Sequence, residues 1–295
     1  MTAVAVVAHS RKQLGGGLGE LRRVLTSAGV IDPLWYEVSK SKQAPKVLAK
    51  ALKEGAGLVF VWGGDGMVQK CLDPLASAGA TLAILPAGTA NLLATNLGIP
   101  KEIEGAVQIG LHGARRDLDL GSLNGERFAV MAGAGLDALM IKDANAGMKD
   151  HVGRLAYIWT GAKHLRDPKV KVRIRVDGQK WFKGQATCVL LGNVGKVLGG
   201  ISLFEDAQPD DGHLELGVVS AKSLMDWGRV LGRTLLGDSE GSPFVQMTTG
   251  RTFDIKLDRK TVYELDGGER KATRRLHVAI EPGAISVCVP EEAGR

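Results

Sequence analysis

The sequence lacks several features that would assign a protein class at once. It contains only three cysteines, Cys71, Cys188 and Cys288, which are far apart and odd in number. Neither a metal-site spacing nor a disulfide framework connects them, so we expect small core residues in a reducing compartment. No apolar run approaches the roughly 18 residues of a spanning helix, and residues 1–8 resemble a first strand rather than a signal peptide. A cytoplasmic location is therefore expected.

Three common site signatures are lacking as well. The chain has no Gly-x-Ser-x-Gly nucleophile elbow and no GxxxxGK[ST] phosphate loop. Its six histidines show no metal-ligand spacing, so we expect ordinary surface or loop residues. These absences argue against a serine hydrolase of the elbow type, a Walker-type nucleotidase and a histidine metal centre.

What the sequence has in excess is glycine, at 40 of 295 residues, about twice the average share. Clustered glycines outside helix and strand interiors indicate tight turns, or backbone that closely approaches a ligand. Such clusters occur at 15–17, 63–66, 133–135, 199–200 and 267–268.

The first 120 residues alternate between strand-like and helix-like segments. We expect strands at 3–8, 58–62 and 81–85, and helices at 17–27, 44–53, 67–78 and 90–96. Strands and helices in alternation predict a parallel sheet covered on both faces, and hence an α/β domain over residues 1–121.

The pattern changes near Asp117. Asn124-Gly125 and Asp177-Gly178 are strong hairpin signals. Short strands are expected at 117–122, 127–132, 170–176, 181–191, 214–219, 253–257, 261–265 and 276–280, with helices near 154–165 and 224–236. We predict a mostly antiparallel sheet domain over 122–295, a cleft between the domains, and a last strand, 284–290, that pairs with either one.

The first candidate site motif is GGDG at 63–66, between a buried strand and a helix. Ligands of open parallel sheets bind beyond the carboxyl ends of the strands, and glycines there let backbone N–H groups approach phosphate oxygens. Asp65 cannot lie against phosphate without a cation, and Mg²⁺ meets that need. The alternative is a plain turn whose Asp65 caps the helix.

The second motif is PAGTAN at 86–91, again between strand and helix. Thr89 and Asn91 can supply hydroxyl, amide and backbone donors at the same edge of the sheet. The alternative is that Thr89 only caps the helix. Two such loops in adjacent crossovers are more informative than either loop alone.

Residues 61–100, VWGGDGMVQKCLDPLASAGATLAILPAGTANLLATNLGIP, resemble the catalytic domain of the diacylglycerol kinase and sphingosine kinase superfamily. DLDLG at 117–121, PDDGHL at 209–214 and YELDGGE at 263–269 resemble later segments of that family. The resemblance implies that residues 1–121 form a Rossmann-like nucleotide-binding domain and residues 122–295 an antiparallel β-sandwich, with ATP and a lipid acceptor meeting in the cleft. It implies an ATP-dependent lipid kinase, with diacylglycerol as the expected acceptor.

The same resemblance implies roles for individual residues. Asp65 matches a nucleotide and magnesium ligand, Asp119 a second acidic residue of the magnesium network, and Asp266 the general base. Asp211 matches a structural magnesium site, which backbone carbonyls of Gln208 and His213 would complete. The implied nucleotide-binding residues are Gly63, Gly64, Asp65, Gly66, Gly88, Thr89, Asn91, Ser10 and Lys12.

The sequence also departs from the family pattern. Met67 replaces the usual Thr after GGDG, Lys70 a Glu of the following helix, and Leu92 an Asp that often follows the Asn of the second loop. Gly268 lengthens the Asp-Gly-Glu segment before Glu269. Two alternatives therefore stay open: an enzyme resembling NAD kinase, and a nucleotide- or lipid-binding regulator without activity.

A basic strand predicts how such an enzyme would meet a membrane. Lys169, Lys171, Arg173 and Arg175 alternate with aliphatic residues, so their side chains share one face of a strand. Together with the net charge of +6, this face suggests peripheral docking on an anionic bilayer. The alternative is a solvated sheet face. No nucleic-acid partner is expected, and a homodimer is left open.

Overall fold

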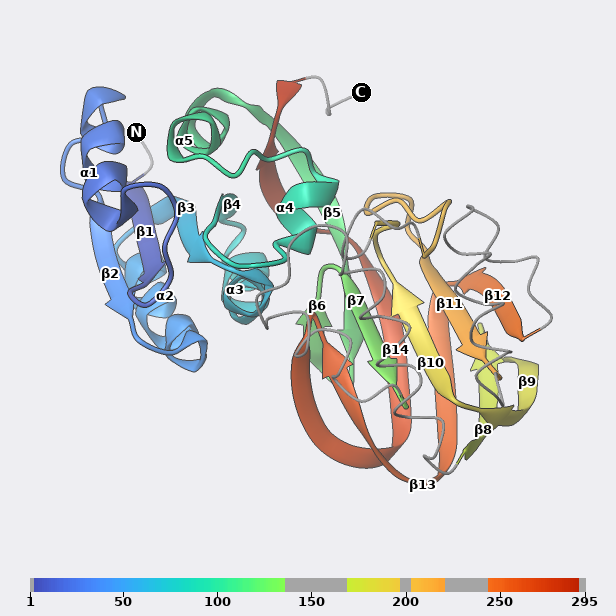
Figure 1. The fold of residues 1–295 in the computed structure, drawn as a ribbon. Helices are drawn as coiled ribbons and strands as arrows, with labels where there is room; N and C mark the ends of the chain where they lie inside the picture. The colour runs from blue at the N-terminus through green and yellow to red at the C-terminus, as the bar shows by residue number, and fades with distance from the viewer. Residues whose placement is uncertain (1–2, 136–168, 197–202, 221–243, 292–295) are drawn as a thin grey trace. The chain divides into compact units, whose positions relative to one another are not determined.

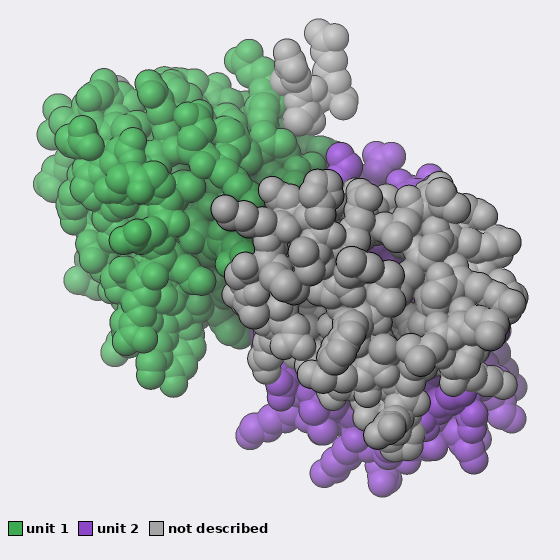
Figure 2. Space-filling view, viewed as in Figure 1, with its two compact units in different colours: residues 1–120, 282–295 green, residues 121–281 purple. Residues whose placement is uncertain are grey.

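The computed structural model describes residues 3–135, 169–196, 203–220 and 244–291 (Figure 1). The chain divides into two compact units, which Figure 2 colours separately. Unit 1 comprises 1–120 and 282–295, and unit 2 comprises 121–281. Strand β5 (Ala114–Leu123) leads from unit 1 into unit 2, and β14 (Gly268–Val289) leads back.

Unit 1 contains a parallel sheet in the order β4-β3-β1-β2. Long apolar runs build it, and five consecutive residues of β3 are buried. The strands are β1 (Ala3–His9), β2 (Leu34–Val38), β3 (Ala56–Gly63) and β4 (Thr81–Pro86). The helices are α1 (Gly17–Ser27), α2 (Ala44–Lys53), α3 (Asp65–Ala78), α4 (Leu92–Asn96) and α5 (Ile103–His112), with a short 3₁₀ turn at Ser41–Gln43.

Unit 2 is built from antiparallel strands around one hydrophobic core. Their order is β12-β11-β10-β7-β13-β14, and β8 lies between β13 and β9. Inward-facing residues alternate with exposed ones along β8, and Phe128 and Phe253 are fully buried in the core. The strands are β6 (Glu126–Phe128), β7 (Met131–Ala134), β8 (Val170–Val176), β9 (Gln179–Ala186), β10 (Cys188–Gly192), β11 (Leu214–Val219), β12 (Val245–Gly250) and β13 (Thr252–Leu265).

The predicted fold class, a parallel α/β part followed by antiparallel strands, is confirmed. Several boundaries needed correction. The expected strand 181–191 is two strands, β9 and β10. The expected strands 253–257 and 261–265 are one strand, β13, and 276–280 is part of the long β14. The helices expected near 154–165 and 224–236 lie outside the described residues.

Two further expectations can be compared with the structure. Cys71, Cys188 and Cys288 are all buried and free, as expected for small core residues, and burial raises the pKa of the Cys71 thiol to about 12. Within the described ranges, no helix is both long and apolar enough to cross a membrane.

Helix α5 packs closely on the sheet because it contains Gly110. A Cβ atom at this position would lie 2.2 Å from a ring carbon of Phe60 and 3.1 Å from Cβ of Ala83. Phe60 is fully buried in β3, so its ring cannot move aside into solvent. The glycine therefore permits a helix-to-sheet distance that a larger residue would prevent.

We expect Gly110→Ala to lower the free energy of unfolding by about 1–3 kcal/mol, because overpacking outweighs the gain in helix propensity. Gly19→Ala is the matched control, because Gly19 lies in α1 and an added Cβ there has no heavy atom within 4 Å. It should stabilise by about 0.5–1 kcal/mol. Urea unfolding measures both, and two changes of the same sign would contradict the packing argument.

Candidate functional site

Three loops of unit 1 share one edge of the parallel sheet. β1, β3 and β4 are neighbours, with Ala8 opposite Trp62 and Gly63 opposite Pro86. Their carboxyl ends therefore lie side by side, and the loops that follow begin at the same edge. The indole N–H of Trp62 donates to the carbonyl of Lys12 at 3.2 Å, which ties the first loop to the end of β3. The candidate segments 10–12, 63–66 and 86–91 are thus brought together.

The GGDG and PAGTAN loops touch through their glycines. A Cβ atom on Gly88 would lie 2.4 Å from Cα of Gly64, closer than two such atoms can approach. The N–H of Ala87 donates to the carbonyl of Gly63 at 3.0 Å and extends the pairing of β3 with β4 by one bond. The two loops therefore form one compact surface of backbone, and part of the glycine content serves this contact.

Asn91 holds the PAGTAN loop closed. It is buried and adopts the left-handed conformation, with φ of +49°. Its side-chain oxygen accepts from the N–H of Gly88 at 2.8 Å, and its amide donates to the carbonyls of Pro86 at 3.1 Å and Gly88 at 2.8 Å. The structure thus shows a loop-building role, and nucleotide contact by Asn91 stays a prediction. Thr89 is exposed on the same loop.

Asp65 is the half-buried carboxylate of this surface and the first residue of α3. Its Oδ1 accepts from the N–H of Leu93, in α4, at 3.3 Å. Burial raises the pKa of Asp65, more than the hydrogen bonds from Leu93 and Leu92 lower it. The charged carboxylate is therefore incompletely compensated by the protein, and a bound cation would supply what is missing.

Mg²⁺ fits this chemistry, because it prefers oxygen ligands and is commonly held by one or two carboxylates together with water and substrate phosphates. A cage made by the protein alone is not seen: within the part of the chain that the structure describes, no three His, Cys, Asp or Glu side chains form a metal-binding group. Asp65 is the residue at these loops that would hold the ion.

The loop after β1 is positively charged. Lys12 is exposed, and burial together with the charge of Lys12 lowers the pKa of His9. The hydroxyl of Ser10 donates to the carbonyl of Val38 at 3.2 Å, so it helps to close the end of β1 against β2. Lys12 and Ser10 lie at the expected edge of the sheet, and their contact with phosphate stays a prediction.

Two departures from the family pattern are core residues here. Met67 is only 2% exposed, and its Cβ lies 2.4 Å from the position that a Cβ of Gly63 would take. Leu92 is buried as well, at the start of α4. Both side chains therefore pack inside unit 1, where a hydroxyl or carboxylate would need polar partners.

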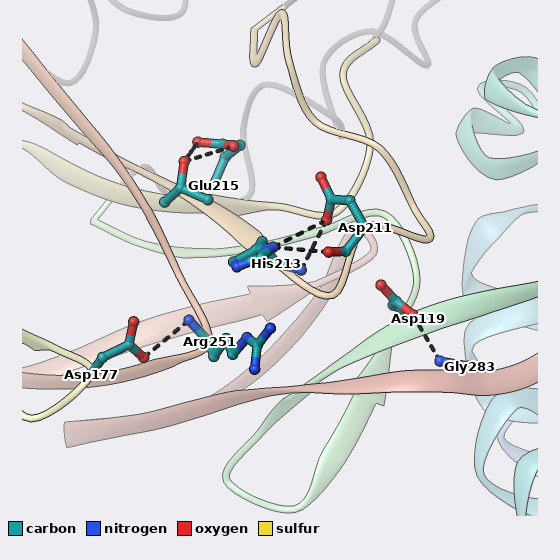
Figure 3. A network of polar contacts seen from close by, with 8 residues as sticks. Asp119, Asp177, Asp211, His213, Glu215, Arg251 and Gly283 are labelled. Atoms are coloured by element: carbon teal, nitrogen blue, oxygen red, sulfur yellow. Dashed lines mark hydrogen bonds and ion pairs between the residues drawn. The ribbon is translucent and has the colours of Figure 1, made fainter.

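The two other predicted magnesium ligands have hydrogen-bond partners within their own units (Figure 3). Asp119 is buried in β5 and accepts from the N–H of Gly283 at 2.7 Å, both within unit 1. In unit 2, Asp211 accepts from the N–H of His213 at 2.8 Å, and its carbonyl lies 2.9 Å from Nδ1 of the same histidine. Metal binding by Asp119 or Asp211 stays a prediction.

Asp266 lies in unit 2, in the two-residue turn that joins β13 to β14. Asp266 and Gly267 both have positive φ, 45° and 76°, as a type I′ hairpin turn requires. The buried carboxylate accepts from the N–H groups of Ala129, Val130 and Met131, each at 2.9 Å. A structural role in the turn is therefore established, and the general-base role stays a prediction.

Asp177 repeats this arrangement at a second turn. Asp177 and Gly178 have φ of 49° and 78°, and the Asp177 carboxylate accepts from the N–H groups of Arg251 at 3.1 Å and Thr252 at 2.8 Å (Figure 3). The sequence assigns no chemistry to Asp177. Asp-Gly with a backbone-bonded carboxylate is thus a structural device of unit 2, which makes Asp177 a suitable control for Asp266.

Two features of the site were missed by sequence reasoning. The backbone N–H groups of Leu92 and Leu93 face Asp65, and the only sequence signal for this is an Asn suited to a left-handed turn just before α4. In the glycine cluster 15–17, the N–H of Gly16 donates to the Glu20 carboxylate and that of Gly17 to the carbonyl of Leu14, so these two amides already have partners.

Comparison with known proteins covers nearly the whole chain. Residues 6–123 match the family model for the diacylglycerol kinase catalytic domain. Residues 130–289 match the YegS C-terminal NAD kinase beta sandwich-like domain. A protein of Pseudomonas aeruginosa (strain UCBPP-PA14) named "Probable lipid kinase YegS-like" is 30% identical over 259 residues, 84% of this chain and 81% of its own length. The diacylglycerol kinase of Bacillus subtilis (strain 168) is 30% identical over 225 residues, 74% of each chain.

Solved structures show the same fold. A diacylglycerol kinase from Bacillus anthracis str. Sterne aligns with a TM-score of 0.78 at 21% identity and covers 99% of this chain and 98% of its own. An NAD kinase from Archaeoglobus fulgidus in complex with ATP aligns with a TM-score of 0.55 at 10% identity, over 99% and 96% of the two chains. At these identities the likeness concerns the fold alone.

We expect Asn91→Ala to lower the free energy of unfolding by about 2–4 kcal/mol, because it leaves buried backbone groups without partners and strains a left-handed residue. Asn91→Gly loses the same hydrogen bonds but adopts positive φ freely. The free energy of unfolding should therefore fall by about 1 kcal/mol less than in Asn91→Ala. Denaturant unfolding of both variants measures the difference. A milder effect of alanine than of glycine would contradict the role given to the backbone conformation.

Proposed function

The chain belongs to the lipid kinase family defined by the diacylglycerol kinase catalytic domain and the YegS C-terminal domain, and we propose that it transfers the γ-phosphate of ATP to the hydroxyl of diacylglycerol. The family makes the chain a lipid kinase, and the choice of acceptor is our proposal. It is supported by the relative of Bacillus subtilis that is named for that lipid. The observation that carries the proposal is Asp65 at two touching glycine loops, at the carboxyl ends of β3 and β4.

Phosphoryl transfer needs little covalent chemistry from the protein, and positioning and charge neutralisation do most of the work. We propose that the backbone of Gly64, Gly66 and Gly88 lies against the ATP phosphates and that Lys12 adds positive charge at the same edge. Asp65 would hold Mg²⁺, which when bound neutralises charge on the phosphate oxygens. The raised pKa of Asp65 supports this role, because a cation relieves the cost of its buried charge.

Asp266 is the proposed general base of unit 2. A lipid hydroxyl must lose its proton as it attacks phosphorus, and a carboxylate held in one orientation can accept that proton. Three backbone N–H groups fix the Asp266 carboxylate, so the group would be positioned before substrate arrives. The same hydrogen bonds would also serve a purely structural residue, and the variants described below separate the two roles.

The acceptor can be identified directly. The purified chain is incubated with radiolabelled ATP, Mg²⁺ and mixed micelles that contain diacylglycerol, a sphingoid base or ceramide, and with NAD in a separate reaction. We expect label in diacylglycerol. Label in NAD alone would overturn the proposal in favour of the enzyme that shares the fold, and labelling of no acceptor would favour a binding protein without activity.

We expect Asp65→Asn to have opposite effects on activity and stability. Loss of a preorganised charge should reduce lipid phosphorylation by a factor of about 10²–10³. The raised pKa of Asp65 means that the folded protein holds this proton more tightly than the unfolded chain, so stability falls as pH rises through the interval between the two pKa values. Above that interval the folded protein bears the full cost of burying the charged carboxylate. Asparagine removes it, and the ligand-free variant should be at least as stable as wild type at pH 7.

Melting temperatures of Asp65→Asn and wild type at pH 7 and near pH 3.5 test the sign of this stability difference. The advantage of the variant should shrink at the lower pH, where the wild-type carboxyl is protonated in the folded protein and in most of the unfolded chains. A variant that keeps more than a tenth of wild-type turnover would exclude the proposed charge role, since a tenfold change is only about 1.4 kcal/mol of barrier.

We expect Asp266→Asn to abolish turnover at saturating ATP and to leave ATP affinity unchanged. Asparagine suits the same type I′ turn but loses an acceptor, so a stability loss of about 1–3 kcal/mol is also expected. Asp177→Asn is the matched control, because it alters the same kind of turn in the same unit. Equal losses of stability with loss of turnover only in Asp266→Asn would support the general base; equal turnover in the two variants would leave Asp266 a turn residue.

A further inference from the structure

Four cationic side chains form a row across four adjacent strands of unit 2. Arg173 of β8 is opposite Lys183 of β9 on one side and Lys256 of β13 on the other. Lys256 is in turn opposite Arg275 of β14. Directly opposite residues of antiparallel strands project from the same face of the sheet. We call Lys183, Arg173, Lys256 and Arg275 the cation row, which spans roughly 14 Å at the usual strand spacing.

The cation row lies on the solvent face of the sheet, since all four residues are exposed. The residues that alternate with them, including Val172, Ile255 and Leu276, are buried in the core on the other face. A shallow hollow of about 480 Å³ opens beside three members of the row, Arg173, Lys183 and Lys256, and its lining also includes Lys171. One carboxylate, that of Asp258, also lies there and accepts from the N–H of Lys171 at 3.2 Å.

Among the described residues, the cation row itself contains no carboxylate. None of its members forms an ion pair with a described carboxylate. The neighbouring row of the same sheet is different, because Asp254 there lies opposite Arg175 and contacts His277 at 2.8 Å. Like charges directly opposite each other destabilise a sheet. The protein therefore keeps three repulsive pairs in one row and places a carboxylate in the next.

Protection of a sheet edge does not explain the row. Lysine on an exposed edge strand discourages pairing with other chains, and Lys183 lies on β9, which pairs only with β8 in the described sheet. Arg173 and Lys256 lie on interior strands, where no edge needs protection. An anionic partner outside the sheet would relieve the repulsion between these interior cations.

We propose that the cation row docks the protein on the surface of an anionic lipid bilayer. The inference rests on the proposed function, because a lipid kinase must reach an acceptor held in a membrane. A bilayer presents many phosphates in one plane, which matches cations spread across a sheet face, and each cation near such a surface adds to the attraction. The residues that line the hollow include no aromatic side chain on which a nucleic-acid base could stack.

Vesicle sedimentation of the full chain tests the proposal without any kinase assay. Vesicles of phosphatidylcholine alone are compared with vesicles of equal parts phosphatidylcholine and phosphatidylglycerol. The test variant is Arg173→Glu with Lys256→Glu. The control is Lys46→Glu with Lys53→Glu, two exposed residues of α2 in unit 1, which changes net charge by the same amount. Melting curves check folding, and the test variant should melt close to wild type, because the pairs with Lys183 and Arg275 become attractive while the pair between positions 173 and 256 stays like-charged.

We expect wild type to bind only the anionic vesicles, and to bind them less at high salt because the attraction is screened. The test variant should bind at least about tenfold more weakly, and the control variant should bind nearly as well as wild type. Unchanged binding by the test variant would overturn the proposal, as would equal losses in both variants, which would indicate net charge rather than a face. Tighter binding to single-stranded RNA than to vesicles would also overturn it.

A kinase readout separates this inference from the proposed function. Phosphorylation of a short-chain, water-soluble diacylglycerol should be the same in the test variant and wild type, because the cation row is not placed in the catalytic machinery. If that activity is missing in wild type while anionic vesicles are still bound through the row, the proposed function fails and the docking face stands. If the activity is present but the test variant binds vesicles as well as wild type does, the proposed function stands and the docking face fails.

Discussion

The parallel pairing of β3 with β4 is the contact on which the candidate site depends. It places Gly63 opposite Pro86, so that the two loops that follow start at the same height of the sheet. Side chains at positions 64 and 88 would clash, and the absence of Cβ atoms at Gly64 and Gly88 lets the two backbones come into contact. Asn91 then fixes the second loop, and the start of α4 turns its amides toward Asp65. Each step presupposes the register of the two strands.

This arrangement sets stability against function at Asp65. A packed core would favour an uncharged residue there, because burial disfavours the carboxylate more than the amides of Leu93 and Leu92 favour it. The same tension exists in the cation row, where like charges oppose each other across three pairs of strands. In both places the isolated protein bears an electrostatic cost that a ligand of opposite charge would remove. Such uncompensated charge distinguishes Asp65 and the cation row from Asn91 and Asp177, whose polar atoms serve the fold.

Much of the fold follows from local sequence patterns. α1, α2, β8 and β11 begin and end where periodicity predicts, because each has a clear apolar face or alternation. α5 was missed because Gly105 and Gly110 argue against a helix, and the reason for Gly110 is a tertiary contact with Phe60. β2 was missed because it is short and half-buried at the sheet edge. The sequence predicts two strands in place of β13 because the charged run 258–260 interrupts the apolar alternation, and the pairing with β14 shifts register across this stretch.

The sequence predicts which loops form the candidate site, but it does not predict the role of each residue in them. GGDG and PAGTAN are visible because glycines and polar residues follow buried strands, but their hydrogen bonds are not, and Asn91 proves to be a loop-building residue. Asp266 and Asp177 look alike in sequence and adopt the same turn. Along β8 the sequence shows alternating cations, whereas the row from Lys183 to Arg275 depends on three registers between strands. A slip of one residue in any of them would turn a cation toward the core, so the hydrophobic alternation that builds the core also aligns the charges.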